Sequence, residues 1–162
     1  MRIDDDLYAL ALQLGHALSA RKAMVATAES CTGGLVAGVI TAVAGSSAWF
    51  DRGFVTYSNE AKMEQLGVLR ETLATFGAVS TETASEMATG ARRVSRAQWT
   101  IAVTGVAGPG GGSIEKPVGM VCFGWAGPCG VASEQRLLQG DRAGIRRESV
   151  RIAMTGLIGQ LA

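Results

Sequence analysis

The spacing of apolar positions changes several times along this chain, and each change predicts a helix or a strand. Leucines recur at helical spacing from about Asp4 to Lys22, which predicts an opening amphipathic helix. Residues 24–28 form a short apolar run, which is typical of a buried strand. Gly33 and Gly34 then open a second predicted helix that continues to about Val43.

The middle of the chain continues this alternation. Aromatic and β-branched residues over 49–57 predict a strand. Asn59 is a suitable N-cap for a helix that carries Lys62 and Leu66. Ser80 is a suitable N-cap for a further helix, whose apolar residues fall on one face.

The last part of the chain predicts a buried strand over 99–104 and two more strands near 118–125 and 131–138. A Gly-Pro turn joins the last two, so we expect them to form a hairpin. Asp141 then caps a final helix that reaches Leu161.

Strands that alternate with helices imply a largely parallel sheet that is covered on both faces. The hairpin adds one antiparallel strand. The predicted fold class is therefore α/β, a three-layer α/β/α arrangement with a mixed, mostly parallel sheet. The length of 162 residues suits a single domain over the whole chain.

Composition narrows the functional class. The chain is 48% hydrophobic and 18% charged, as folded globular proteins are, and its net charge of +1 provides no bulk attraction to nucleic acid or to an anionic membrane. Three aspartates near the N-terminus do not resemble a signal peptide, and the most apolar stretch, 34–44, is too short to span a bilayer. We therefore expect a cytoplasmic protein without a nucleic-acid or membrane partner.

The metal-binding residue types are scarce. Three cysteines form no Cys-x-x-Cys pair, and His16 is the single histidine. A structural zinc site would lack its usual ligands, so we expect no metal.

Three predicted strands end in hydroxyl-bearing residues, and this is the most informative feature of the sequence. Ser30, Tyr57 and Thr104 each stand at the end of a strand, beside glycines or a turn. Ligands of such sheets bind beyond the carboxyl ends of the strands, so these side chains are expected near one another. Taken alone, Ser30 would also be explained as a helix cap.

A serine hydroxyl is a weak nucleophile until a neighbouring base takes its proton. No histidine is placed to do this, but Lys62 follows the Tyr57 strand end within about one helical turn. A lysine that is buried beside Ser30 can lose its proton near neutral pH through desolvation. The alternative is a solvated surface lysine.

The glycine-rich loop over 105–112 can serve as an anion cradle, because closely spaced backbone N–H groups supply donors. Arg142, Arg146 and Arg147 lie in the first turns of the final predicted helix and can add phosphate contacts. A solvated helix face explains these arginines equally well.

Taken together, these segments resemble the CinA C-terminal domain family. The resemblance covers nearly the whole chain in order, and it is carried by residues 27–34, 45–47, 56–59 with Lys62, 79–80, 104–111 and 116–119. It implies a three-layer α/β/α fold with a mixed sheet, in agreement with the pattern analysis. Members of the family are often dimers, so a homodimer is expected.

The resemblance also implies an activity, the hydrolysis of the carboxamide of nicotinamide mononucleotide to nicotinic acid mononucleotide and ammonia. It implies Ser30 as nucleophile and Lys62 as base, with Tyr57 and Ser47 supporting that pair. No metal or organic cofactor is implied. The expected substrate-binding residues are Cys31, Thr32, Gly33, Gly34, Thr104, Gly105, Gly108, Gly110, Arg142 and Arg146.

Two other functions remain open at this stage. The same glycine loops fit a non-catalytic nucleotide-binding or regulatory module, in keeping with the family's link to competence and DNA damage. An amidase of the same mechanism that acts on another small amide is the second alternative.

Overall fold

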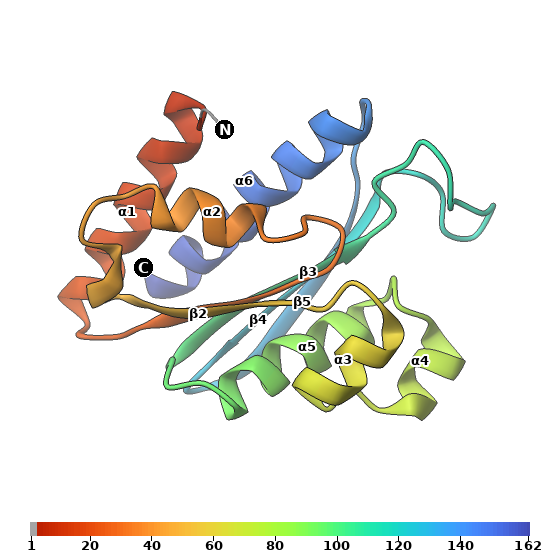
Figure 1. The fold of residues 1–162 in the computed structure, drawn as a ribbon, viewed down its shortest axis with the longest axis horizontal. Coiled ribbons are helices and arrows are strands. Elements are labelled where there is room, and N and C mark those ends of the chain that lie inside the picture. The colour runs from red at the N-terminus through yellow and green to blue at the C-terminus, as the bar shows by residue number, and fades with distance from the viewer. Residues whose placement is uncertain (1–2) are drawn as a thin grey trace.

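The computed structural model describes residues 3–162, and it alternates strands with helices as the sequence pattern predicts (Figure 1). The strands are β1 (Val25–Glu29), β2 (Phe50–Val55), β3 (Trp99–Gly105), β4 (Met120–Gly127) and β5 (Gly130–Leu137). The helices are α1 (Asp5–Ala20), α2 (Leu35–Thr41), α3 (Asn59–Leu66), α4 (Arg70–Phe76), α5 (Thr81–Arg93) and α6 (Arg142–Leu161), with a short 3-10 helix η1 (Ser46–Ala48).

The five strands form one sheet in the order β2-β1-β3-β4-β5. β1 pairs in parallel with β2 and β3, whereas β4 is antiparallel to both of its neighbours, β3 and β5. The mixed, mostly parallel sheet with one antiparallel strand is therefore confirmed. β5 joins β4 through the predicted hairpin turn.

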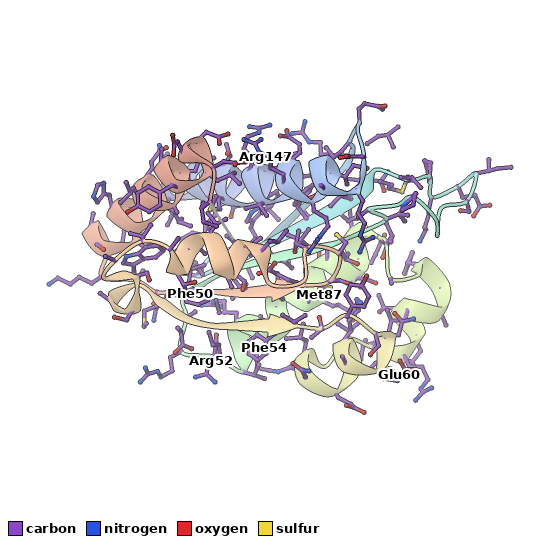
Figure 2. The ribbon with its side chains drawn as sticks, turned by 45° about the horizontal axis from the view of Figure 1, so that its top comes forward. Phe50, Arg52, Phe54, Glu60, Met87 and Arg147 are labelled. Carbon is purple, nitrogen blue, oxygen red and sulfur yellow. The ribbon has the colours of Figure 1, made fainter. Side chains whose placement is uncertain are left out.

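Helices cover both faces of the sheet (Figure 1). α1, α2 and α6 pack on one face, around a large core that includes Leu14, Ile101 and Leu157. α5 packs on the other face with α3 and α4 beside it, and Met87 of α5 is fully buried there. Figure 2 shows Arg147 on α6, on the opposite side of the sheet from Phe54 of β2.

The observed helix starts agree with the predicted ones, except that the cap of α3 is a different residue and that α4 was not predicted. Ser80 and Asp141 accept amide hydrogen bonds as N-caps of α5 and α6, as predicted. The cap of α3 is Ser58, whose Oγ accepts from the amide of Ala61, whereas Asn59 is already the first helical residue. The seven-residue α4 was not predicted, because its sequence has no clear apolar period.

The turn between β1 and α2 is longer than the sequence pattern suggested. Gly33 and Gly34 do not begin the helix; both have positive φ, of 58° and 96°, and α2 begins only at Leu35. Left-handed backbone of this kind favours glycine, which lets the chain fold back directly after β1. Within residues 3–162, no helix is long and apolar enough to cross a membrane.

Candidate active site

Ser30 is held at the carboxyl end of β1, between two other strand ends. Its amide donates to the carbonyl of Val103 in β3 (2.9 Å), and the amide of Thr56 after β2 donates to the carbonyl of Glu29 (2.8 Å). The parallel ladder thus continues past the strands and fixes the backbone on both sides of Ser30. The Ser30 side chain itself is nearly buried, with 8% of the residue exposed.

Lys62 reaches Ser30 from α3. Its Nζ atom lies 3.0 Å from Ser30 Oγ, 2.9 Å from the carbonyl oxygen of Thr56 and 3.4 Å from that of Tyr57. The Ser58 cap starts α3 directly after β2, and one turn of helix then carries Lys62 back over the strand ends. The structure therefore brings together the two residues that the sequence placed 32 positions apart.

The surroundings of Lys62 disfavour its charged form. The residue is only 1% exposed, and within residues 3–162 it makes no ion pair with a carboxylate. Burial lowers the pKa of the Lys62 ammonium from its ordinary value of 10.5. A neutral amine at this distance from Ser30 Oγ can accept the hydroxyl proton.

Cys31 follows Ser30 in the same turn, but its thiol is not suited to act as a nucleophile. Burial raises the pKa of the Cys31 thiol to about 12, and the nearby Glu29 carboxylate adds to the effect. A thiol is nucleophilic as the thiolate, so a protonated Cys31 is inert near neutral pH. Of these two neighbouring side chains, Ser30 is the one whose polar atom lies within hydrogen-bond distance of the buried Lys62 amine.

A pocket of about 310 Å³ opens over this pair. Its lining comes from the ends of β1, β2 and β3, the start of α3, the segment before α5, the glycine-rich loop and the start of α6. The lining residues are Ser30, Cys31, Tyr57, Asn59, Lys62, Ala78, Val79, Thr104, Gly105, Val106, Ala107, Gly108, Gly110, Gly111 and Arg142. The hydroxyl of Thr104 donates to the carbonyl of Ala78 (2.8 Å), which ties β3 to the segment before α5. The three predicted strand ends thus meet at one pocket.

Tyr57 and Arg142 stand together at the pocket rim. Arg142 donates from Nη1 to the carbonyl of Gly108 (2.7 Å) and from Nη2 to the Tyr57 hydroxyl (3.4 Å). Tyr57 is 62% exposed. Its side chain lies in the mouth of the pocket, while its backbone carbonyl is the part that contacts Lys62.

The other two arginines of α6 contact protein groups. Arg146 donates to the carbonyls of Cys31 and Thr32, both at 3.1 Å, so it fastens the Ser30 turn from the α6 side. Arg146 also lines a neighbouring hollow of about 640 Å³ that shares Ala107 and Arg142 with the pocket over Ser30. Arg147 pairs with Asp4, before α1, and with Asp6 of α1, and it does not line the pocket.

Some predicted site residues lie elsewhere. Ser47 is exposed in η1, which lies directly before the start of β2. Ser30 and Lys62 lie beyond the carboxyl ends of the parallel strands, so Ser47 is at the opposite end of these strands. Its position in this chain gives no support to a role beside Lys62. Thr32, Gly33 and Gly34 belong to the turn but do not line the pocket.

Sequence reasoning also missed several residues of the site. Asn59, Val79 and Ala107 line the pocket; all three lie in stretches that carry the family resemblance, but none was predicted as a site residue. Glu29 was overlooked as well: its carboxylate is fully buried and accepts three backbone N–H groups directly beside Ser30. A carboxylate at the end of an apolar run, directly before the turn that begins at Ser30, is a signal that could have been used.

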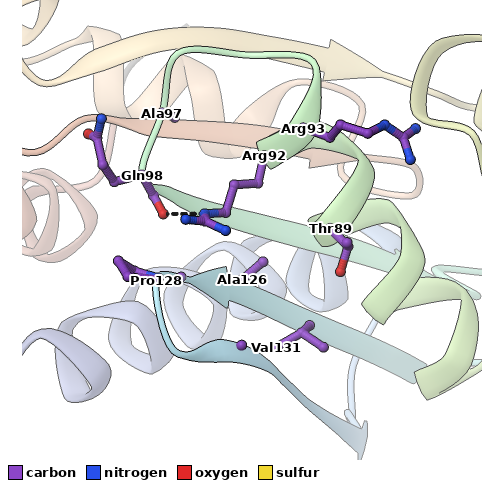
Figure 3. A pocket seen from close by; sticks show the side chains of 10 residues that line it. Thr89, Arg92, Arg93, Ala97, Gln98, Ala126, Pro128 and Val131 are labelled. Atoms are coloured by element: carbon purple, nitrogen blue, oxygen red, sulfur yellow. Dashed lines mark hydrogen bonds between the residues drawn. The ribbon is translucent and has the colours of Figure 1, made fainter.

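A larger hollow, of about 760 Å³, lies at the other end of the sheet, beside the start of β3 and the β4–β5 turn (Figure 3). Arg92 of α5 lines this hollow and donates from Nε to the carbonyl of Gln98 (2.9 Å). Its lining holds neither a hydroxyl-lysine pair nor a carboxylate. The candidate site is therefore the smaller pocket at Ser30, because its lining holds the hydroxyl and the amine that the larger hollow lacks.

Within residues 3–162, no group of three or more His, Cys, Asp or Glu side chains is arranged to hold a metal ion. The described site places the Ser30 hydroxyl within hydrogen-bond distance of the buried Lys62 amine, at the carboxyl edge of an α/β sheet. The sequence profile described as "CinA C-terminal domain" matches residues 7–161, and the chain belongs to this family.

Individual relatives agree with this assignment. The chain is 54% identical over 155 residues to the nicotinamide-nucleotide amidohydrolase PncC of Escherichia coli K12, which covers 95% of this chain and 94% of that protein. It is 49% identical to the PncC of Pseudomonas putida, over 95% and 96% of the two chains. The crystal structure of the competence/damage inducible protein CihA from Agrobacterium tumefaciens superposes with a TM-score of 0.94 at 51% identity, covering 98% of both chains.

Proposed function

We propose that this protein is an amidohydrolase that converts nicotinamide mononucleotide to nicotinic acid mononucleotide and ammonia through a Ser30 acyl-enzyme. The observation that carries the proposal is the 3.0 Å contact between the buried Lys62 amine and Ser30 Oγ. The choice of amide is supported by the relatives named nicotinamide-nucleotide amidohydrolase, which match nearly the full length of the chain.

In the first half-reaction, neutral Lys62 takes the proton of Ser30 while Oγ bonds to the carboxamide carbon. The tetrahedral intermediate then breaks its carbon–nitrogen bond, and the proton held by Lys62 passes to the departing ammonia, directly or through Tyr57. In the second half-reaction, Lys62 takes a proton from water as that water attacks the ester. Breaking the ester returns the proton to Ser30 Oγ and releases the carboxylic acid.

The negative charge of the tetrahedral oxygen needs backbone donors, and the contacts within the turn limit which amides are available. The amide of Gly33 donates to the Ser30 carbonyl and that of Gly34 to Glu29. The amides of Cys31 and Thr32 make no hydrogen bond to another group within residues 3–162. We assign these two amides to the oxyanion, a contribution that typically reaches about 3 kcal/mol per donor.

The glycine-rich loop and Arg142 bind the phosphate of the substrate in this proposal. Arg142 is the arginine that lines the pocket, and it already holds the loop at the Gly108 carbonyl. Gly105, Gly108 and Gly110 line the same wall. Arg146, which is engaged with the Ser30 turn, is assigned a supporting part at the neighbouring hollow.

The test is ammonia release from nicotinamide mononucleotide by the wild-type protein, by Ser30→Ala and by Ser133→Ala, an exposed serine on β5 that serves as the matched control. We expect Ser30→Ala to lose at least about a thousandfold in kcat, and Ser133→Ala to retain full activity. Near-normal turnover by Ser30→Ala refutes the nucleophile assignment. Binding of the nucleotide by the wild type without product would favour a non-catalytic module, and turnover of a different small amide would favour another amidase.

We further propose that the enzyme acts as a cytoplasmic homodimer, an expectation that rests on the family resemblance. Light scattering coupled to size-exclusion chromatography measures the mass in solution. A mass of one chain, 16.8 kDa, contradicts the dimer.

A further inference from the structure

We propose that Glu29 is a positioning residue for the proposed reaction. Its buried carboxylate occupies the amide donors at the start of α2, fixes the turn that carries Ser30, and leaves the amides of Cys31 and Thr32 as the free donors of that turn. The inference rests on the proposed function, in which Ser30 is the nucleophile.

The contacts of Glu29 are all with backbone. Oε2 accepts from the amides of Gly34 and Val36, both at 3.0 Å, and Oε1 accepts from that of Ala37 at 2.9 Å. The residue is fully buried, and within residues 3–162 it has no lysine or arginine within ion-pair distance. Three donors thus converge on one carboxylate that no side-chain cation balances.

A buried charge is tolerated only where hydrogen bonds replace its hydration. The first amides of a helix have no partner inside the helix and carry a partial positive charge, so they suit a carboxylate. Gly34, the N-cap of α2, has no side chain to offer, and Glu29 reaches across from β1 to take that place. The last residue of the strand is thereby bonded to the start of the helix, and Ser30 lies in the short connection between them.

The peptide units of this connection are fixed from the other side as well. Arg146 donates to the carbonyls of Cys31 and Thr32, and the amide of Gly33 donates to the carbonyl of Ser30. In a trans peptide the N–H points opposite to the carbonyl. The amide of Thr32 therefore points away from Arg146, and that of Cys31 points away from the amide of Gly33.

The backbone amides of the turn and of the start of α2 therefore form two groups, those that donate to Glu29 and those of Cys31 and Thr32. Glu29 accepts from the amides of Gly34, Val36 and Ala37, so these cannot compete for the substrate or for water. Loss of one oxygen acceptor would free at least one of them and allow the turn to relax. A shift of about 1 Å in a nucleophile or an oxyanion donor is sufficient to slow a reaction about a hundredfold.

Glu29→Gln is the direct test, because the glutamine has the same shape but replaces one acceptor oxygen with an NH₂ donor. Thr100→Val is the matched control: it removes a buried hydrogen bond, from Thr100 Oγ1 to the Ala88 carbonyl (2.7 Å), at the far end of β3. Unfolding temperature, kcat and KM are measured for both variants. Hydrogen exchange at the amides of Gly34, Val36 and Ala37 is measured by NMR.

We expect Glu29→Gln to lose about a hundredfold in kcat while KM changes less than about threefold. At least one of the three amides should exchange about tenfold faster or more. Thr100→Val should lower the unfolding temperature comparably and leave kcat unchanged. A kcat loss in Glu29→Gln no larger than in Thr100→Val, or unchanged exchange at all three amides, overturns the inference.

The two proposals fail in different ways. An active Ser30→Ala enzyme refutes the proposed nucleophile, and the positioning role of Glu29 fails with it. An inactive Ser30→Ala enzyme beside a fully active Glu29→Gln enzyme refutes the positioning role alone.

Discussion

The Nζ atom of Lys62 lies 3.0 Å from Ser30 Oγ, and the residue that carries it is 1% exposed. The other polar atoms around this amine are the carbonyl oxygens of Thr56 and Tyr57. A carbonyl oxygen can accept a hydrogen bond but cannot supply a countercharge. Lys62 is therefore held where it is more easily deprotonated than in water and where the nearest proton to take is that of Ser30.

The pH dependence of turnover should follow Lys62. Because burial lowers the pKa of the Lys62 ammonium from 10.5, the active neutral form accumulates below that pH. We expect kcat for ammonia release to rise with pH along a limb of slope one and to level off below pH 10.5. A limb that levels off only at pH 10.5 or above contradicts the assignment of Lys62 as base.

The same burial makes Lys62 a cost to stability while it is protonated. Between the lowered pKa in the native state and 10.5 in the unfolded chain, the unfolded state binds more protons, so the free energy of unfolding rises with pH in that window. In Lys62→Met the side chain has no titratable group, so this contribution to the pH dependence is absent. We expect the stability of the wild type relative to Lys62→Met to rise between pH 7 and pH 10, by at most about 1.4 kcal/mol per pH unit.

Urea unfolding of both proteins at the two pH values measures this difference. The difference cancels the titration of all other groups, which the two proteins share. A difference that stays constant or falls with rising pH contradicts the stated direction. Lys62→Met should at the same time be inactive at both values.

The three thiols should differ sharply in reactivity. Burial raises the pKa of Cys31 to about 12 and that of Cys122 to about 11, whereas Cys129 is exposed. We expect a disulfide reagent at pH 8 to modify Cys129 rapidly in the folded protein and the other two only after unfolding. Mass spectrometry of the labelled protein identifies the site.

Cys31→Ala tests the same point through activity. We expect it to keep kcat within about tenfold of the wild type, because the thiol provides packing rather than a nucleophile. A loss as large as that of Ser30→Ala contradicts this assignment.

Gly90 decides how closely α5 approaches the end of α3, the helix that carries Lys62. A Cβ atom at this position would lie 1.9 Å from the Leu66 carbonyl oxygen. Gly90→Ala must therefore push the two helices apart, and we expect it to lower the free energy of unfolding by about 1–3 kcal/mol and to reduce kcat.

The matched control is Gly159→Ala in α6, where a Cβ atom meets nothing within 4 Å. There the substitution should raise stability by about 0.5–1 kcal/mol through helix propensity and leave kcat unchanged. Urea unfolding and ammonia release measure both variants. Equal effects of the two alanines would show that the contact with Leu66 is not the cause.

Local patterns in the sequence were sufficient for most of the fold. The apolar runs and the caps Ser80 and Asp141 predicted their elements, because these signals act between residues a few positions apart. The antiparallel β4 followed from two adjacent strands with a short turn, which leaves no room for a parallel crossover. The seven-residue α4 was not predicted, because a helix of this length is stabilised by packing against the rest of the protein rather than by a periodic apolar pattern in its own sequence.

The sequence by itself determined that Ser30, Tyr57 and Thr104 would end strands at one edge of a parallel sheet. Only the tertiary structure decided which side chains meet there. It brought Lys62 to Ser30, placed Ser47 at the opposite edge, and joined Glu29 to the start of α2. Such contacts depend on how α3, α5 and α6 pack on the sheet, and packing is set by burial across the whole chain rather than by neighbouring residues.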